Sequence, residues 1–311
     1  MAQAPVIWDP DRWLAPVAPT TLPDGSTFFL GCTYAAEMGY RPVTLDLRIP
    51  AGVINPPLVV YVHGGAWMFG DRRYLPPTLK FNQLFDSFIS AGIAVATVDY
   101  RHAMEAPHPA QIHDVKAAIR YLRYFSDTFL FDSHRIGIMG ESAGGHIASF
   151  VALTHKNPQY DGKIGIAEGS VEITACVNWY GVNDFTIHKE KAFTEEQLQE
   201  FSEIIPEWAK NGFYYYLFGG QQEDQGVLRA ASSLYQVSGD AQPMLLQHGD
   251  ADIVVPVENS YKLYEALLAQ GIDVELDVIK GADHIWEGKS PAEIAAIIDR
   301  SVQFLAKKLT A

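Results

Sequence analysis

The sequence predicts an α/β protein in which a mainly parallel central sheet is flanked by helices. Six short, continuously apolar segments are typical of buried parallel strands, and they alternate with stretches whose apolar residues recur every three or four positions, as in amphipathic helices. A chain of 311 residues with 48% hydrophobic and 19% charged residues can bury such a sheet. No repeat, low-complexity tract or linker divides the chain, so we expect a single domain over residues 1–311.

The first clear strand is expected at residues 43–49, where Val43, Leu45, Leu47 and Ile49 share one face. This alternation is typical of a half-exposed, antiparallel strand. The buried strands are expected at residues 58–62, 93–98, 135–139, 173–177, 243–248 and 274–279. Amphipathic helices are expected around residues 112–122, 257–268 and 294–305.

Residues 184–218 break the alternation of strands and helices. They contain a polar helix candidate from Thr194 to Ala209 and a cluster of aromatic residues, where a short connection would suffice. We interpret this segment as an insertion at the strand ends that forms a small cap over a site. The alternative is a surface excursion without a role.

Charge and composition exclude several classes of partner. The formal net charge is −14 and no block of Lys and Arg is present, so nucleic acid and anionic membranes are poor partners. The opening residues lack a basic segment followed by an apolar one, and no apolar stretch reaches the length of a membrane span. We therefore expect a cytoplasmic protein with Cys32 and Cys176 as free thiols; the composition also allows a homo-oligomer.

The sequence GESAGG places Ser142 between Gly140 and Gly144. An apolar strand precedes the serine and a helix from Ala143 to about Thr154 follows it, so the glycines allow a sharp strand-to-helix turn that lifts the serine above the sheet. The first amide of the helix, that of Ala143, then points to where an oxyanion would develop. We predict that Ser142 is a nucleophile; the alternative is a turn serine without a function.

A second turn, HGGAW, ends the first buried strand. Small residues let backbone N–H groups approach a ligand closely, so Gly64, Gly65 and Ala66 are candidate donors of an oxyanion hole. Ala66 keeps its amide, although its methyl group narrows the pocket. We expect His63 to hold this loop through ring hydrogen bonds.

A nucleophilic serine needs a base and a carboxylate that orients the base. In this architecture the acid follows a late strand and the histidine follows the last strand. His284 is the histidine after the last expected strand, while Asp250 and Asp252 follow the strand before it. We expect Asp252 to contact His284, Asp250 to bond to loop backbone, Asp283 to point to solvent, and His248 to bond to backbone.

Seven motifs occur together along the chain: HGGAW (63–67), DYR (99–101), PAQIHDVKAAIRYLR (109–123), GESAGGHIA (140–148), WYGVNDF (179–185), HGDADIVVP (248–256) and GADH (281–284). Together they resemble the α/β-hydrolase fold, and the chain is most similar to the hormone-sensitive-lipase-like and bacterial BD-FAE type carboxylesterases, which include acetylxylan and feruloyl esterases. The resemblance covers about residues 40–308. It implies Ser142 as nucleophile, Asp252 as triad acid and His284 as base, with Gly64, Gly65 and Ala143 as the main oxyanion donors and Ala66 in reserve.

These features predict a serine carboxylesterase that forms an acyl-enzyme on Ser142 and acts on small-molecule esters, with acetyl to butyryl acyl groups or aryl and carbohydrate alcohols. We expect no metal site and no organic cofactor. Aromatic residues at the strand ends are the expected substrate walls: Trp67, Trp179, Tyr180 and Trp286. The alternatives are a formamidase or other amidase on the same triad, as in kynurenine-formamidase relatives, and a catalytically silent hydrolase fold used as a binding module.

Overall fold

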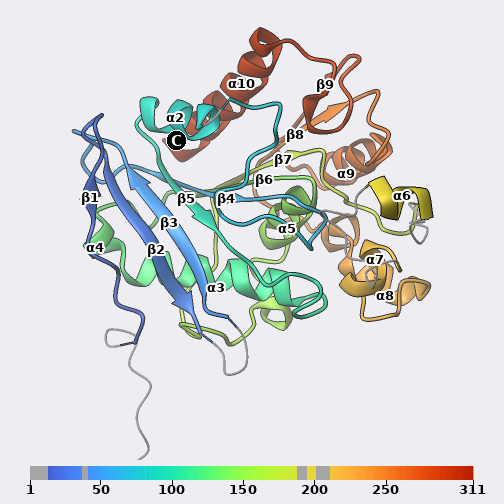
Figure 1. The fold of residues 1–311 in the computed structure, drawn as a ribbon, viewed down its shortest axis with the longest axis horizontal. Coiled ribbons are helices and arrows are strands. Elements are labelled where there is room, and N and C mark those ends of the chain that lie inside the picture. Colours follow the sequence, from blue (N-terminus) through green and yellow to red (C-terminus); the bar gives the residue numbers. More distant parts are fainter. Residues whose placement is uncertain (1–12, 37–40, 81, 188–194, 201–210, 311) are drawn as a thin grey trace, which may run out of the picture.

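The computed structural model describes residues 13–36, 41–80, 82–187, 195–200 and 211–310. Within these ranges the strands form one nine-stranded sheet in the order β1-β2-β3-β5-β4-β6-β7-β8-β9 (Figure 1). The strands are β1 Thr20–Thr21, β2 Thr27–Ala35, β3 Val43–Ile49, β4 Leu58–Val62, β5 Ala94–Val98, β6 Ile136–Glu141, β7 Ala175–Trp179, β8 Met244–Gly249 and β9 Val274–Ile279.

The sheet is parallel from β5 through β4 to β9, and antiparallel where β1, β2, β3 and β5 pair. The predicted α/β class with a mainly parallel sheet is therefore confirmed. The ends of the seven expected strands lie within about two residues of the observed ones. The long strand β2, which lies between the short edge strand β1 and β3, was not expected as an element of its own.

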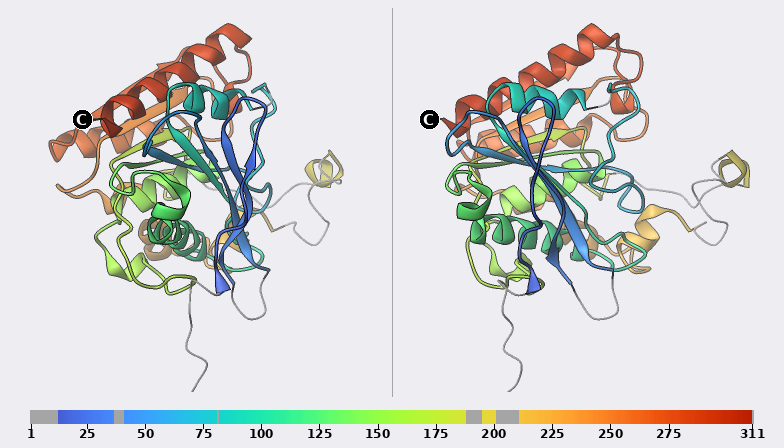
Figure 2. Two further views of the ribbon diagram at one scale, coloured as in Figure 1. Left: turned by 90° about the vertical axis from the view of Figure 1, so that its left-hand side faces the viewer. Right: turned by 60° about the vertical axis from the view of Figure 1, so that its left-hand side comes forward.

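Helices cover both faces of the sheet, with α2 and α10 on one side and α3 and α5 on the other (Figure 2). Strand β4 shows why both faces are covered, because Val60 and Val62 belong to one buried cluster and Val59 and Tyr61 to the other. The helices are α2 Gln83–Ser90, α3 Ala110–Tyr124, α4 Ser126–Phe129, α5 Ala143–Leu153, α6 Glu195–Glu200, α7 Phe213–Leu217, α8 Gln225–Ala231, α9 Glu258–Ala269 and α10 Pro291–Leu309.

Only part of the predicted insertion at 184–218 belongs to the described residues. The expected helix from Thr194 to Ala209 is described over α6 alone, and its remainder lies outside the described residues. Helix α7 buries Tyr214 and Leu217. The end of the insertion is thus joined to the protein core.

Candidate active site

Ser142 occupies a strained turn between β6 and α5. Its backbone has φ 53° and ψ −120°, in a region that residues other than glycine rarely adopt. Gly140 and Gly144 make the turn possible, because a Cβ on Gly140 would overlap the backbone of Gly144 and a Cβ on Gly144 would overlap the carbonyl of Val62. The two glycines allow the serine to stand at the end of the strand.

Two further side chains reach the site of Ser142 from the ends of β8 and β9, on the same side of β6 in the sheet. The Nε2 atom of His284, which follows β9, lies 3.0 Å from Ser142 Oγ. The Nδ1 atom of His284 lies 2.8 Å from Oδ2 of Asp252, which follows β8. Burial opposes ionisation of Asp252, but hydrogen bonds with His248 and His284 outweigh it and hold the pKa of this carboxyl well below its usual value. The structure therefore aligns serine, histidine and an ionised carboxylate.

The two neighbouring aspartates have other contacts. Asp250 Oδ1 accepts the Gly281 amide at 2.5 Å, as expected for a loop contact. The expectation that Asp283 points to solvent is wrong, because its Oδ1 accepts the amides of Ile253 at 3.0 Å and His284 at 2.7 Å. Asp283 thus links the loop that carries Asp252 to the loop that carries His284.

His248 has the expected backbone contact and one contact that was not expected. Its Nε2 atom lies 2.8 Å from the Val255 carbonyl oxygen, and its Nδ1 atom lies 2.7 Å from Ser260 Oγ. The same Nε2 atom is 3.4 Å from Oδ2 of Asp252. Two imidazole rings therefore flank the carboxylate of Asp252.

The predicted oxyanion donors divide into two groups. The amide of Gly64 donates to the Glu141 carboxylate, so the prediction that it faces a substrate is wrong. Within the described chain, the amides of Gly65, Ala66 and Ala143 make no hydrogen bond. Gly65 and Ala66 have φ angles of 92° and 51° and are partly exposed, as a turn beside a ligand site would be.

His63 holds this turn from within the core, as expected. Its Nδ1 atom lies 2.8 Å from the Gly64 carbonyl oxygen, and its ring stacks on Tyr100 with centroids 4.4 Å apart. Burial lowers the pKa of His63 to about 4, so the ring stays neutral. The hydroxyl of Tyr100 donates to the carbonyl oxygens of His63 and Gly64, at 3.1 and 3.0 Å.

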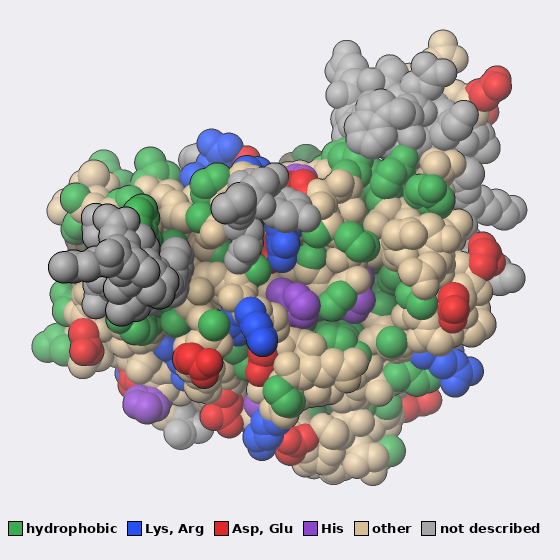
Figure 3. Space-filling view, turned by 90° about the horizontal axis from the view of Figure 1, so that it is seen from below, with side chains coloured by type: hydrophobic (Ala, Val, Ile, Leu, Met, Phe, Trp, Pro, Cys, Tyr) green, Lys and Arg blue, Asp and Glu red, His purple; other side chains and the backbone are tan. Residues whose placement is uncertain are grey.

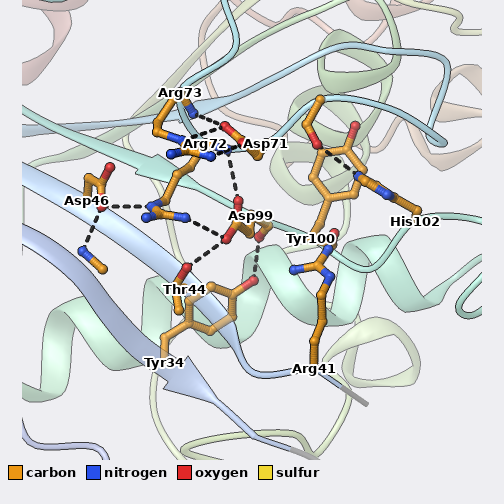
Figure 4. A network of polar contacts seen from close by, with 12 residues as sticks. Tyr34, Arg41, Thr44, Asp46, Asp71, Arg72, Arg73, Asp99, Tyr100 and His102 are labelled. Carbon is orange, nitrogen blue, oxygen red and sulfur yellow. Dashed lines mark hydrogen bonds and ion pairs between the residues drawn. The ribbon is translucent and has the colours of Figure 1, made fainter. Parts of the chain in front are cut away.

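A polar network anchors the chain that follows the turn to the antiparallel strands (Figure 4). The guanidinium of Arg72 donates to Asp46 at 2.7 Å and to Asp99 at 3.2 Å, and the Arg72 amide also donates to Asp99. Thr44 and Tyr34 donate to the same Asp99 through its side chain and its carbonyl. The turn is therefore fixed at both ends.

The four predicted aromatic substrate walls are core residues. Trp179, Tyr180 and Trp286 are 0% exposed and Trp67 is 3% exposed, so the prediction that they contact a substrate is wrong for this structure. The indole N–H of Trp67 donates to His146, and the rings of Trp179, Tyr180 and Trp286 pack against one another. Position at a strand end did not reveal that these side chains turn inward.

We expect Trp179→Phe to lower the free energy of unfolding by about 2 kcal/mol while leaving catalysis intact in the folded fraction, because it removes buried volume and an N–H donor. That N–H lies 2.8 Å from Gln247 Oε1 and 3.0 Å from Ser301 Oγ. Urea unfolding and steady-state rates test this expectation. A raised KM with unchanged stability would restore the substrate-wall interpretation.

The described end of the insertion packs, through aromatic rings, against the HGGAW turn (63–67) and Phe69, which follows it. Phe69 and Phe213 have ring centroids 6.0 Å apart, and Trp67 lies 5.9 Å from Tyr214 and 5.6 Å from Phe185. These contacts join residues that are far apart in the sequence. Phe213, from the aromatic cluster expected in the insertion, and Phe69, which the sequence analysis did not single out, are both half-buried.

The described residues hold no group of three or more His, Cys, Asp or Glu side chains arranged to bind a metal ion. On the face in Figure 3, acidic and basic side chains are interspersed among apolar ones. Both cysteines are free and buried, as expected. Among the described helices, none combines the length and the apolar character needed to cross a membrane.

The strand order, the turn at Ser142 and the chain order of serine, aspartate and histidine define the α/β-hydrolase fold class. The chain belongs to the BD-FAE family, whose pattern it matches over residues 45–267. Esterase LipC of Mycobacterium tuberculosis is 31% identical over 214 residues, which are 68% of this chain and 48% of that protein. The chain spans about half the length of the curated relatives it matches.

Solved structures share the fold. A truncated carbohydrate esterase from gut microbiota superimposes with a TM-score of 0.75 at 23% identity, over 91% of this chain and 96% of the other. A bifunctional GH43-CE protein of Bacteroides eggerthii gives a TM-score of 0.73 at 25% identity, over 90% of this chain and 38% of the other.

Proposed function

We propose that this protein is a serine carboxylesterase that hydrolyses small-molecule esters through an acyl-enzyme on Ser142. The observation that supports this proposal most strongly is the hydrogen-bonded series from Ser142 through His284 to Asp252, at the carboxyl ends of parallel strands. The resemblance to Esterase LipC, at 31% identity, supports an ester substrate. The free amides of Gly65, Ala66 and Ala143 supply donors for an oxyanion.

Each residue has a defined step in this mechanism. Nε2 of His284 accepts the proton of Ser142 Oγ as the oxygen attacks the ester carbonyl, and returns it to the leaving alcohol. Asp252 accepts the Nδ1–H of His284 and stabilises the imidazolium. A water molecule, deprotonated by the same histidine, then hydrolyses the acyl-enzyme.

Labelling and turnover test this proposal together. A fluorophosphonate should form one covalent adduct, located on Ser142 by peptide mass spectrometry, and p-nitrophenyl butyrate should be hydrolysed. N-formylkynurenine and an acetylated xylo-oligosaccharide are assayed beside it. Faster turnover of the formamide would favour an amidase, whereas no adduct and no turnover would favour a silent binding module.

Short acyl groups are the expected preference. The Ala66 methyl and the ring pair of Phe69 and Phe213 crowd the space beside the oxyanion turn, which favours acetyl to butyryl chains over long ones. In a p-nitrophenyl ester series, we expect kcat/KM on butyrate to exceed that on decanoate by about tenfold or more. A rate that keeps rising to decanoate would contradict the crowded pocket.

Phe213→Ala should relax this preference, because it removes one of the two rings beside the turn. We expect the octanoate-to-butyrate ratio of kcat/KM to rise about threefold to tenfold. Tyr215→Ala is the matched control, since Tyr215 belongs to the same helix but is 37% exposed. Equal ratios in both variants would place the acyl chain elsewhere.

A further inference from the structure

Glu141 is a buried carboxylate directly before the proposed nucleophile. It is 1% exposed, and burial raises its pKa to about 7. A carboxylate in such a place lowers stability unless it has strong partners. Within the described chain, its carboxylate accepts one hydrogen bond, from the Gly64 amide. The mechanism above gives Glu141 no role.

The register of the sheet places Glu141 beside the oxyanion turn. Val62 of β4 pairs with Gly140 of β6, so the residues that follow, His63 and Glu141, lie next to each other where the two strands end. A Cβ on Gly64 would overlap the Glu141 carboxylate. Glycine at position 64 therefore allows the carboxylate to lie against the main chain.

Two consecutive peptide units are held by side chains at this point. In the unit between His63 and Gly64, the N–H donates to Glu141 and the carbonyl oxygen accepts from Tyr100. In the unit between Gly64 and Gly65, the carbonyl oxygen faces Tyr100 and the ring of His63. Because N–H and C=O point in opposite directions in a trans peptide, these contacts direct the Gly65 amide away from the core.

The geometry points to Glu141 as a positioning residue of the oxyanion hole, which acts through Gly64 and together with Tyr100 to aim the Gly65 amide at the substrate. This inference rests on the proposed esterase function. The raised pKa agrees with it, since perturbed carboxyls kept at a cost to stability are frequent at functional sites. Backbone N–H groups that are already oriented towards the oxyanion stabilise it as its charge develops, because they need no reorganisation during the reaction.

A matched pair of variants tests the role of the acceptor. Glu141→Gln keeps an oxygen that can accept the Gly64 amide, whereas Glu141→Met has a similar length and no such oxygen. On p-nitrophenyl butyrate, we expect the methionine variant to lose about 10²-fold in kcat with KM nearly unchanged, as after loss of one oxyanion donor. We expect the glutamine variant to stay within about tenfold of the wild type.

The inhibition constant of a trifluoromethyl ketone provides a second measurement, which should not change if Glu141 has a purely structural role. The ketone adds reversibly to the serine and presents an oxyanion, so its inhibition constant should rise in parallel with the loss of kcat. Tyr100→Phe removes the hydroxyl that holds the same two peptide units, and it should lower kcat and ketone affinity about threefold to tenfold. Tyr160→Phe is the control, because its hydroxyl also donates to a carbonyl, that of Ala230.

Wild-type kcat and ketone affinity in a folded Glu141→Met variant would overturn the inference. If that variant does not fold, wild-type values in Tyr100→Phe would overturn it. Lower melting temperatures with unchanged kinetics would also do so. If the wild type is inactive and is not labelled, the proposed function itself is wrong. If the wild type is active and the variants have the same kinetics as the wild type, only the role of Glu141 is wrong.

Discussion

Ser142→Ala is expected to lower kcat on p-nitrophenyl butyrate by a factor on the order of 10⁶, because no other group can take over nucleophilic attack. The imidazole of His284, 3.0 Å from Oγ in the wild type, then has no hydroxyl to deprotonate. The turn should stay folded, since the strained backbone and the flanking glycines are unchanged. Steady-state kinetics, fluorophosphonate labelling and thermal unfolding measure the three effects.

The control for this variant is Ser126→Ala, at the start of α4. It should retain wild-type kinetics and labelling. Hydrolysis by Ser142→Ala above a few per cent of the wild-type rate, with contaminating esterase excluded by labelling, would remove Ser142 from the mechanism.

Asp252→Asn is expected to lower kcat by about 10⁴-fold, because an amide in this place favours the wrong tautomer of His284 and cannot stabilise its charged form. The carboxylate lies 2.8 Å from Nδ1, and its depressed pKa keeps it ionised at neutral pH. The ionised carboxylate of Asp252 therefore stabilises the folded protein fully at pH values above the usual aspartate pKa. This stabilisation is lost only as the pH falls below that value, towards the lower pKa that Asp252 has in the folded protein.

Asp250→Asn is the matched control, since Asp250 is two residues away and contacts the Gly281 amide instead of the histidine. We expect its kcat to remain within about threefold of the wild type. Equal losses in Asp250→Asn and Asp252→Asn would mean that the loop conformation, not the carboxylate on His284, determines the rate.

The sequence predicted features that depend on order along the chain. The apolar runs predicted the strands, and the positions of Ser142, Asp252 and His284 after three of the parallel strands predicted that these side chains would meet. Parallel strands align their carboxyl ends, so chain order alone determines which residues share an edge.

Features that depend on side-chain direction could not be predicted in this way. Nothing in the sequence around Trp179 or Trp286 shows that the ring points into the core instead of into a pocket. The contact between Glu141 and Gly64 depends on the register of β4 against β6, which joins segments separated by 77 residues. Asp283 likewise finds its partner Ile253 across two loops.

The placement of the three residues on strands distant in the chain has a consequence for refolding. Ser142 and His284 are 142 residues apart, and they meet only after β6, β7, β8 and β9 have paired in register. A slip of one residue in any pair would turn the following side chains to the opposite face. After dilution from denaturant, hydrolytic activity should therefore return more slowly than the circular dichroism signal of the helices. The rate at which activity returns would then measure the last step of sheet assembly.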